Sequence, residues 1–162
     1  MNMVYSTIPS LPMLSYEIGV TRLFGSCDLG HVGLVEGWSE PEEGHVWNDG
    51  AQAIMHVTMR KPRSACTLTF EGEPFITDGC ERQDINLFVN GFHIGSWRLT
   101  QARGYRLSAR IEPEQLWERR DKTVAHCVWC LPRSIRPSEL GLGSDDRELG
   151  FCFRTFDISE EG

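Results

Sequence analysis

Short runs of alternating apolar and polar residues, separated by turn residues, recur along the whole chain, and no stretch carries a long helical pattern. Many short strands at regular spacing are typical of an all-β sandwich. We therefore predict a jelly-roll-like antiparallel β-sandwich of eight or nine strands. The candidate strands are residues 16–24, 32–38, 51–59, 65–70, 84–89, 92–99, 105–111, 123–131 and 150–158.

The clearest local signal is the dipeptide Asn90-Gly91, which stands between two apolar runs. Asparagine and glycine both tolerate the positive φ angles of a type I′ turn, so this pair predicts a tight hairpin. Alternation in the first arm places Ile85, Leu87 and Val89 on one face and turns Phe88 to the other. We expect the first face in the core.

Two other segments, 112–117 and 137–141, predict one or two single-turn helices. In each, a proline is followed by an acid in the first turn, where the helix dipole favours negative charge. The length of 162 residues suits one domain. We predict a single sandwich over residues 16–158, with an N-terminal extension at 1–15 and a C-terminal tail at 159–162.

Charge and hydropathy narrow the classes of partner. The chain has 16 basic and 23 acidic residues, and its net charge of −7 disfavours nucleic acid. No apolar run approaches the roughly 20 residues of a membrane helix, so no membrane insertion is expected. Residues 1–19 contain no Lys or Arg and are interrupted by Pro9 and Pro12, unlike a signal peptide. We expect a cytoplasmic protein whose six cysteines are reduced thiols.

The sequence gives little support for a metal, a cofactor or a nucleophile. Cys127 and Cys130 have half the spacing of a zinc site, with His126 beside them, but in a strand they point to opposite faces. The five histidines form no recognisable triad signature, and no glycine-rich phosphate loop precedes a helix. We expect no metal site and no cofactor.

Tryptophan is the remaining chemical signal, with five in one small domain. Trp38 and Trp47 bracket a loop rich in acids and amides, and Trp97 lies in the second arm of the hairpin. Indoles stack on the C–H faces of sugar rings, while planar polar groups meet the hydroxyls. The alternative is that Trp38 and Trp47 only cap the open end of the sandwich. The candidate ligand-binding residues are Trp38, Glu42, Trp47, Asn48, Asp49 and Trp97.

Two segments carry a resemblance to a known family. Residues 37–51, which begin Gly-Trp-Ser-Glu-Pro-Glu, and residues 137–151, which contain Ser-Glu-Leu-Gly and Asp-Arg-Glu-Leu-Gly, resemble small β-sandwich domains associated with bacterial cell-surface polysaccharide synthesis. These domains are often appended to glycosyltransferases. The resemblance covers residues 19–158 and departs from the family at Asn48 and Arg136. It implies a sandwich that works in a surface-polysaccharide context.

Glu42 and Arg147 belong to the two segments that carry the resemblance. We expect them to form a bidentate ion pair beside Trp47 that holds the two loops together.

The leading functional hypothesis is a non-catalytic module that binds carbohydrate or positions a glycosyltransferase. One alternative is a protein-interaction or assembly domain that uses an exposed sheet face or edge, and homo-oligomer formation stays open. Another is a sugar-active enzyme that uses Glu40, Glu42 or Asp49, because glycosidases need two carboxylates.

Overall fold

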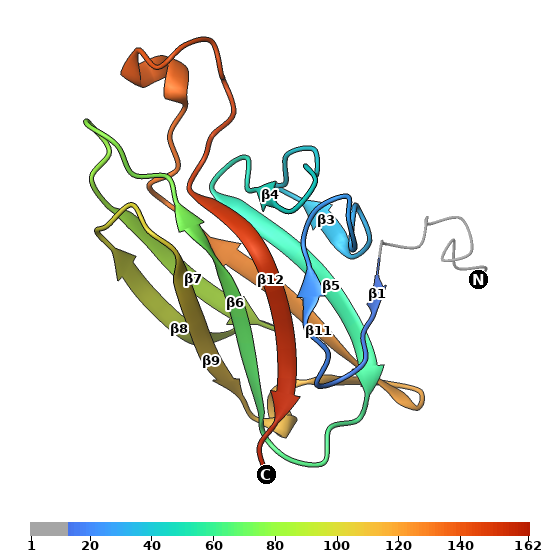
Figure 1. The fold of residues 1–162 in the computed structure, drawn as a ribbon. Helices are drawn as coiled ribbons and strands as arrows, with labels where there is room; N and C mark the ends of the chain where they lie inside the picture. The colour runs from blue at the N-terminus through green and yellow to red at the C-terminus, as the bar shows by residue number, and fades with distance from the viewer. Residues whose placement is uncertain (1–12) are drawn as a thin grey trace, which may run out of the picture.

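The computed structural model describes residues 13–162, which form two facing β-sheets (Figure 1). The larger sheet has the spatial order β1 (Leu14–Ser15), β5 (Gln52–Arg60), β11 (Lys122–Cys130), β7 (Gln83–Val89) and β8 (Phe92–Leu99). Two short strands join it, β3 (Leu34–Glu36) beside β5 and β10 (Trp117–Arg119) beside β11.

The second sheet has the order β2 (Arg22–Leu23), β12 (Phe151–Glu160), β6 (Cys66–Pro74) and β9 (Tyr105–Ile111), and β4 (Val46–Trp47) pairs with β12. All strand pairs are antiparallel except β1 with β5. Two 3-10 turns, η2 (Pro113–Gln115) and η3 (Pro137–Leu140), lie where the sequence predicts them. The predicted β-sandwich is confirmed.

The strand list needs three corrections. The run 16–24 contains only the two-residue β2, because Gly19 adopts a φ of 93° and turns the chain. The short strands β1, β4 and β10 were not predicted, since two or three residues show no alternation. The other predicted runs form strands with shifted ends, and 32–38 shrinks to β3.

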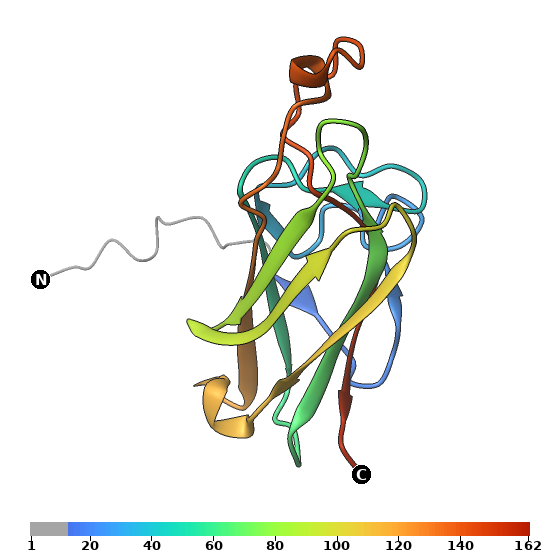
Figure 2. The same ribbon diagram turned by 90° about the vertical axis from the view of Figure 1, so that its left-hand side faces the viewer.

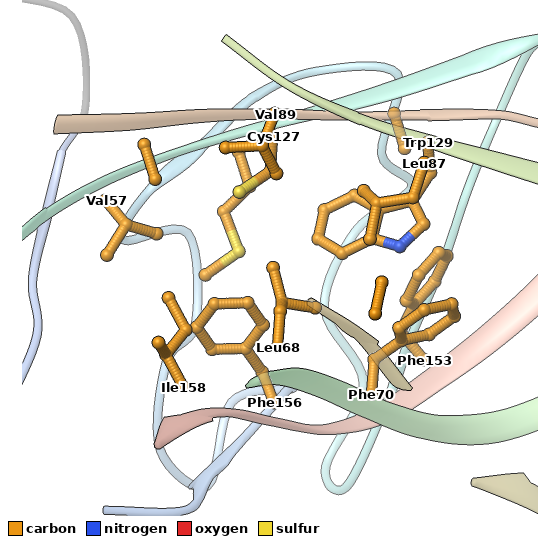
Figure 3. Packing of buried hydrophobic residues seen from close by; sticks show 14 of the residues in the cluster. Val57, Leu68, Phe70, Leu87, Val89, Cys127, Trp129, Phe153, Phe156 and Ile158 are labelled. Carbon is orange, nitrogen blue, oxygen red and sulfur yellow. The ribbon is translucent and has the colours of Figure 1, made fainter. Parts of the chain in front are cut away.

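The core is the dry space between the two sheets (Figure 3). β7 and β11 supply one wall and β6 and β12 the other, with side chains that are all 0% exposed. The wall residues include Leu87, Val89, Cys127 and Trp129 on one side and Leu68, Phe70, Phe153, Phe156 and Ile158 on the other. Burying each large apolar side chain stabilises the fold by roughly 1.5–3 kcal/mol before entropy is counted.

The β7–β8 hairpin forms as predicted. Asn90 and Gly91 have φ angles of 52° and 85°, and Phe88 points away from the core while its alternate neighbours are buried. The Asn90 side chain also donates to the Val124 and Gln115 carbonyls and accepts from the His126 amide. The turn residue therefore ties the hairpin to β11.

A long excursion, residues 132–150, projects beyond one end of the sandwich and carries η3 (Figures 1 and 2). Its neck is closed by two backbone hydrogen bonds between Ile135 and Leu149, each 3.0 Å. The segments around β3 and β4 lie at the same end, whereas η2 lies at the opposite end.

The predicted N-terminal extension, 1–15, lies outside the described residues apart from residues 13–15, where Leu14 and Ser15 form β1. The predicted tail, 159–162, belongs in part to the second sheet, because β12 continues to Glu160. The Glu160 carboxylate pairs with Arg60 at 2.6 Å, and this hydrogen bond lowers the pKa of Glu160 to about 2. Neither helical turn in residues 13–162 is long and apolar enough to cross a bilayer.

All six cysteines are free thiols. Cys127 faces the core while Cys130 is half-buried on the opposite face, as the strand period predicts. Burial raises the pKa of Cys66 to about 11 and those of Cys127 and Cys152 to about 12. Cys27 alone among the six is exposed.

We expect a brief treatment of the folded protein with iodoacetamide to label Cys27 first, because accessible thiolates react and this residue alone is exposed, while Cys130 is half-buried. Peptide mass spectrometry would locate the label, and Cys27→Ser should remove the fast phase. Fast labelling of Cys127 would show that the sandwich opens.

A histidine pair crosses the outer face of the larger sheet. His56 and His126 are direct partners in β5 and β11, and Nε2 of His56 lies 2.5 Å from Nδ1 of His126. Burial, and then the neighbouring His126, lower the pKa of His56. The folded protein therefore binds fewer protons than the unfolded chain just below the ordinary histidine pKa of about 6.5.

Stability should therefore fall as the pH falls from about 7.5 to about 5.5. Urea unfolding at the two pH values measures this slope, and His56→Gln should flatten it. The exposed His93 provides the matched control, since His93→Gln should leave the slope unchanged. An unaltered slope in His56→Gln would contradict the assignment.

Candidate functional site

A hollow of about 650 Å³ opens beside β3, and we call it the β3 hollow. Most of its wall comes from the continuous segment 34–40. Three side chains from outside that segment complete it, namely His31, Asp49 and Arg147. Arg147 arrives from the excursion, so the hollow joins parts of the chain far apart in sequence.

The backbone of this wall depends on a glycine. Gly37 has a φ of 84°, and a Cβ there would lie 1.7 Å from the Gln52 carbonyl oxygen. The Gly37 carbonyl accepts from the Asp49 amide at 2.8 Å, and the Ser39 amide donates to the Trp47 carbonyl at 2.9 Å. These bonds bring Asp49 back alongside the segment that carries Trp38.

Trp38 is half-buried and belongs to both the core and the hollow. Its indole Nε1–H donates to the Ile54 carbonyl at 2.7 Å, and its ring stacks on Phe24 and meets Phe153 edge-on at 5.0 Å. Trp38 is also a lining residue of the hollow. The capping role of Trp38 is therefore observed, and its ligand-binding role stays a prediction.

Ser39 belongs to the wall of the same hollow. The residue is 8% exposed, and its Oγ finds no hydrogen-bond partner among the described residues. Burying a polar atom without a partner costs free energy, about 1–3 kcal/mol for a typical group. Because Oγ is itself sealed from solvent, it lies behind the surface of the wall.

The charged lining is mostly acidic. Glu40 lies 3.2 Å from His31, and Asp49 accepts the Glu148 amide through Oδ1 at 2.9 Å. Arg147 pairs with Asp145 through Nε and Nη2, with a shortest distance of 2.8 Å. Hydrogen bonding to Asp145 raises the pKa of Arg147, and the charges of Asp145, Glu42 and Asp49 raise it further.

The expected ion pair between Glu42 and Arg147 does not form within residues 13–162. Glu42 is exposed and accepts from His45 at 3.0 Å. Asp145 outcompetes it for Arg147 because it lies two residues away and also accepts the Arg147 backbone amide at 3.0 Å. A local partner orders less chain than a distant loop would.

Asn48 is a structural residue and lies outside the lining of the hollow. It is 0% exposed, and its amide donates to the Gly50 carbonyl at 2.8 Å and to the Ser134 hydroxyl at 3.0 Å. Its Oδ1 accepts the Gly150 and Phe151 amides. The predicted ligand-binding role of Asn48 is therefore replaced by a tie between β4, β12 and the excursion.

The two remaining tryptophan candidates lie elsewhere. Trp47 packs edge-on against Phe75 at 6.3 Å and is not part of the lining. Trp97 packs edge-on against Phe70 at 5.3 Å and borders a separate hollow of about 390 Å³ beside β8. Of the six predicted ligand-binding residues, Trp38 and Asp49 are brought together.

Only two of the three carboxylates considered for catalysis lie in the same hollow. Glu40 and Asp49 line the β3 hollow, whereas Glu42 lies outside its lining. Within residues 13–162, no three His, Cys, Asp or Glu side chains converge as they would around a metal ion.

Sequence reasoning missed Ser39, Glu36 and His31 as lining residues. Ser39 and Glu36 flank the Gly37-Trp38 pair, so proximity to that pair was an available signal. Burial of the Ser39 hydroxyl without a partner had no sequence signal, because it depends on the surrounding fold.

No protein-family model matches this chain, and no curated protein matches it. Among solved structures, the chain is similar to a family 35 carbohydrate-binding module from an environmental isolate, with a TM-score of 0.44 and 10% identity over 86% of this chain and 93% of that one. It is also similar to Xyl-CBM35 in complex with a glucuronic acid containing disaccharide, with a TM-score of 0.40 and 12% identity over 94% and 95%. Both TM-scores are below 0.5, so neither likeness assigns a family or a ligand to this chain. The expected link to glycosyltransferases stays a prediction.

We expect Asn48→Ala to lower the free energy of unfolding by about 3 kcal/mol, because two backbone amides and two buried acceptors lose their partner. Urea unfolding followed by circular dichroism measures the change. Asn86→Ala, on the half-buried outer face of β7, should cost only about 0.5 kcal/mol. Equal effects of the two substitutions would refute the structural role of Asn48.

Proposed function

We propose that this chain is a non-catalytic carbohydrate-binding module and that the β3 hollow is its binding site. The observation that carries the proposal is the meeting of Trp38, Asp49 and Arg147 in one open hollow. An indole offers an apolar face to a sugar ring, and charged planar groups can hydrogen-bond with sugar hydroxyls.

The rest of the lining suits the same ligand class. Asp49 has one carboxylate oxygen engaged by the Glu148 amide, and Arg147 has Nη1 without a partner in residues 13–162. Carboxylates accept and guanidinium groups donate, so both can meet the hydroxyls of a sugar. The volume of about 650 Å³ lies within the range of small-molecule sites.

The site is held in place before any ligand arrives. Trp38 is fixed by its hydrogen bond to Ile54 and by the aromatic core, and Asp49 by the Glu148 and Gly37 backbone bonds. A preformed site loses little conformational entropy on binding. This low cost favours ligands such as sugars, which bind through weak polar contacts.

The proposal extends to a cytoplasmic accessory role beside a glycosyltransferase of surface-polysaccharide synthesis. Its support is the sequence resemblance of residues 37–51 and 137–151. Co-purification of the chain with a glycosyltransferase from the source cell tests this part separately from sugar binding.

Titration with a panel of surface-polysaccharide fragments, followed by tryptophan fluorescence and calorimetry, tests the binding site. We expect Arg147→Gln to weaken binding about three- to tenfold, the value of one hydrogen bond, because Nη1 no longer donates to the ligand. The exposed Arg63 lies outside the lining, so Arg63→Gln should bind as the unmodified chain does.

Two results would reject the proposal. One is the absence of binding to every fragment. Together with self-association of the chain, this result would favour the alternative of an assembly domain. The other is full affinity in Arg147→Gln, which would place any sugar site away from the β3 hollow.

A further inference from the structure

We propose that the β3 hollow selects sugars that carry a free, protonated amino group over their neutral and acidic counterparts. This inference rests on the proposed function and specifies its ligand class. It follows from an excess of carboxylates around Trp38 in the lining of the hollow.

The charges of the lining do not balance. Glu36, Glu40 and Asp49 contribute three carboxylates, and Arg147 contributes the one guanidinium. That guanidinium is already held by Asp145, which lies outside the lining and adds its own negative charge. His31, 3.2 Å from Glu40, is the one other side chain of the lining that can carry a positive charge, and Glu36 and Asp49 have no salt-bridge partner among residues 13–162.

The surroundings deepen this negative potential. After its hydrogen bonds to Asp145, the pKa of Arg147 is raised further by the charges of Glu42 and Asp49, so both carboxylates act on the rim of the hollow. The whole chain has the same sign, with a net charge of −7. An acidic sugar would meet like charge on approach, whereas a cation would be attracted.

The polar atoms suit an ammonium group in particular. An ammonium offers three donors and no acceptor, so it needs acceptors around it. Asp49 keeps Oδ2 after Oδ1 has accepted the Glu148 amide, and Glu36 and Glu40 add further acceptors to the lining. Acetylation of the amine removes the positive charge and two of the three donors, which makes an N-acetylated sugar the sharpest comparison.

The positions of the acids also fit a ring seated on the indole. Trp38 stands between Glu36 and Glu40 along the chain, and Asp49 is held alongside by its bond to the Gly37 carbonyl. Carboxylates thus come from both sides of the tryptophan in sequence and from a second loop. A substituent of a stacked ring would meet one of them in several orientations.

Calorimetric titration of the full chain with matched oligosaccharides tests the inference. The probes are a glucosamine oligomer, its N-acetylated counterpart and a uronic acid oligomer of equal length. We expect the glucosamine oligomer to bind about tenfold more tightly than the acetylated one at low salt. The difference should shrink at about 1 M salt, where charges are screened within about 3 Å.

Substitution of single acids separates charge from folding. Glu40 is 80% exposed in its side chain, so Glu40→Gln should keep the thermal midpoint of the unmodified chain. It should weaken glucosamine binding about two- to fivefold, and binding of the acetylated oligomer clearly less, because that oligomer carries no charge at the amine. Glu114→Gln removes the same charge at η2, on the opposite end of the sandwich, and should change neither affinity (Figure 2).

The outcomes distinguish this inference from the proposed function. Equal affinity for the amino and acetylated oligomers, or preference for the uronic acid, would overturn the inference and leave carbohydrate binding intact. A Glu114→Gln effect as large as that of Glu40→Gln would also overturn it, because the attraction would then come from net charge alone. Failure of every oligomer and every polysaccharide fragment to bind would reject the proposed function itself.

Discussion

The packing of aromatic rings between the two sheets is the interaction on which the rest of this structure depends. Trp129 of β11 meets Phe70 of β6 and Phe153 of β12 at centroid distances of 5.6 and 5.3 Å, so one ring cluster joins both sheets. Trp38 extends that cluster outward through its contact with Phe153. The wall of the β3 hollow is therefore, at Trp38, a continuation of the core.

A second constraint is polar. Asn48 is sealed between β4, the start of β12 and the excursion, and it satisfies backbone groups that these three segments could not satisfy alone. The next residue, Asp49, lines the hollow. Its carboxylate accepts a hydrogen bond from the backbone amide of Glu148, the neighbour of Arg147. Asp49 is thus positioned by the chain next to Asn48, which is buried and lies outside the lining. Asp145 orients the guanidinium of Arg147.

The sequence predicted most reliably what local chemistry enforces. Asn90-Gly91 made the hairpin because few other residues accept its φ angles, and the alternation of β7 placed Leu87 in the core. The run 16–24 failed because Gly19 turned the chain within it, and alternation alone does not reveal such a turn. The Glu42–Arg147 pair failed for a related reason, since Asp145 was a nearer partner and loop charges can pair in many ways.

The sequence by itself determined the all-β class, the hairpin, the inward face of β7 and the segment around Trp38, because each depends on residues only a few positions apart. Only the tertiary structure decided that Asn48 is sealed inside, that Trp97 borders a different hollow, and that Ser39 and Arg147 share the hollow with Trp38. These outcomes depend on contacts between residues as much as 103 positions apart, as between Asn48 and Phe151. Such contacts are set by how the two sheets and their loops pack, and periodicity and spacing carry no record of that packing.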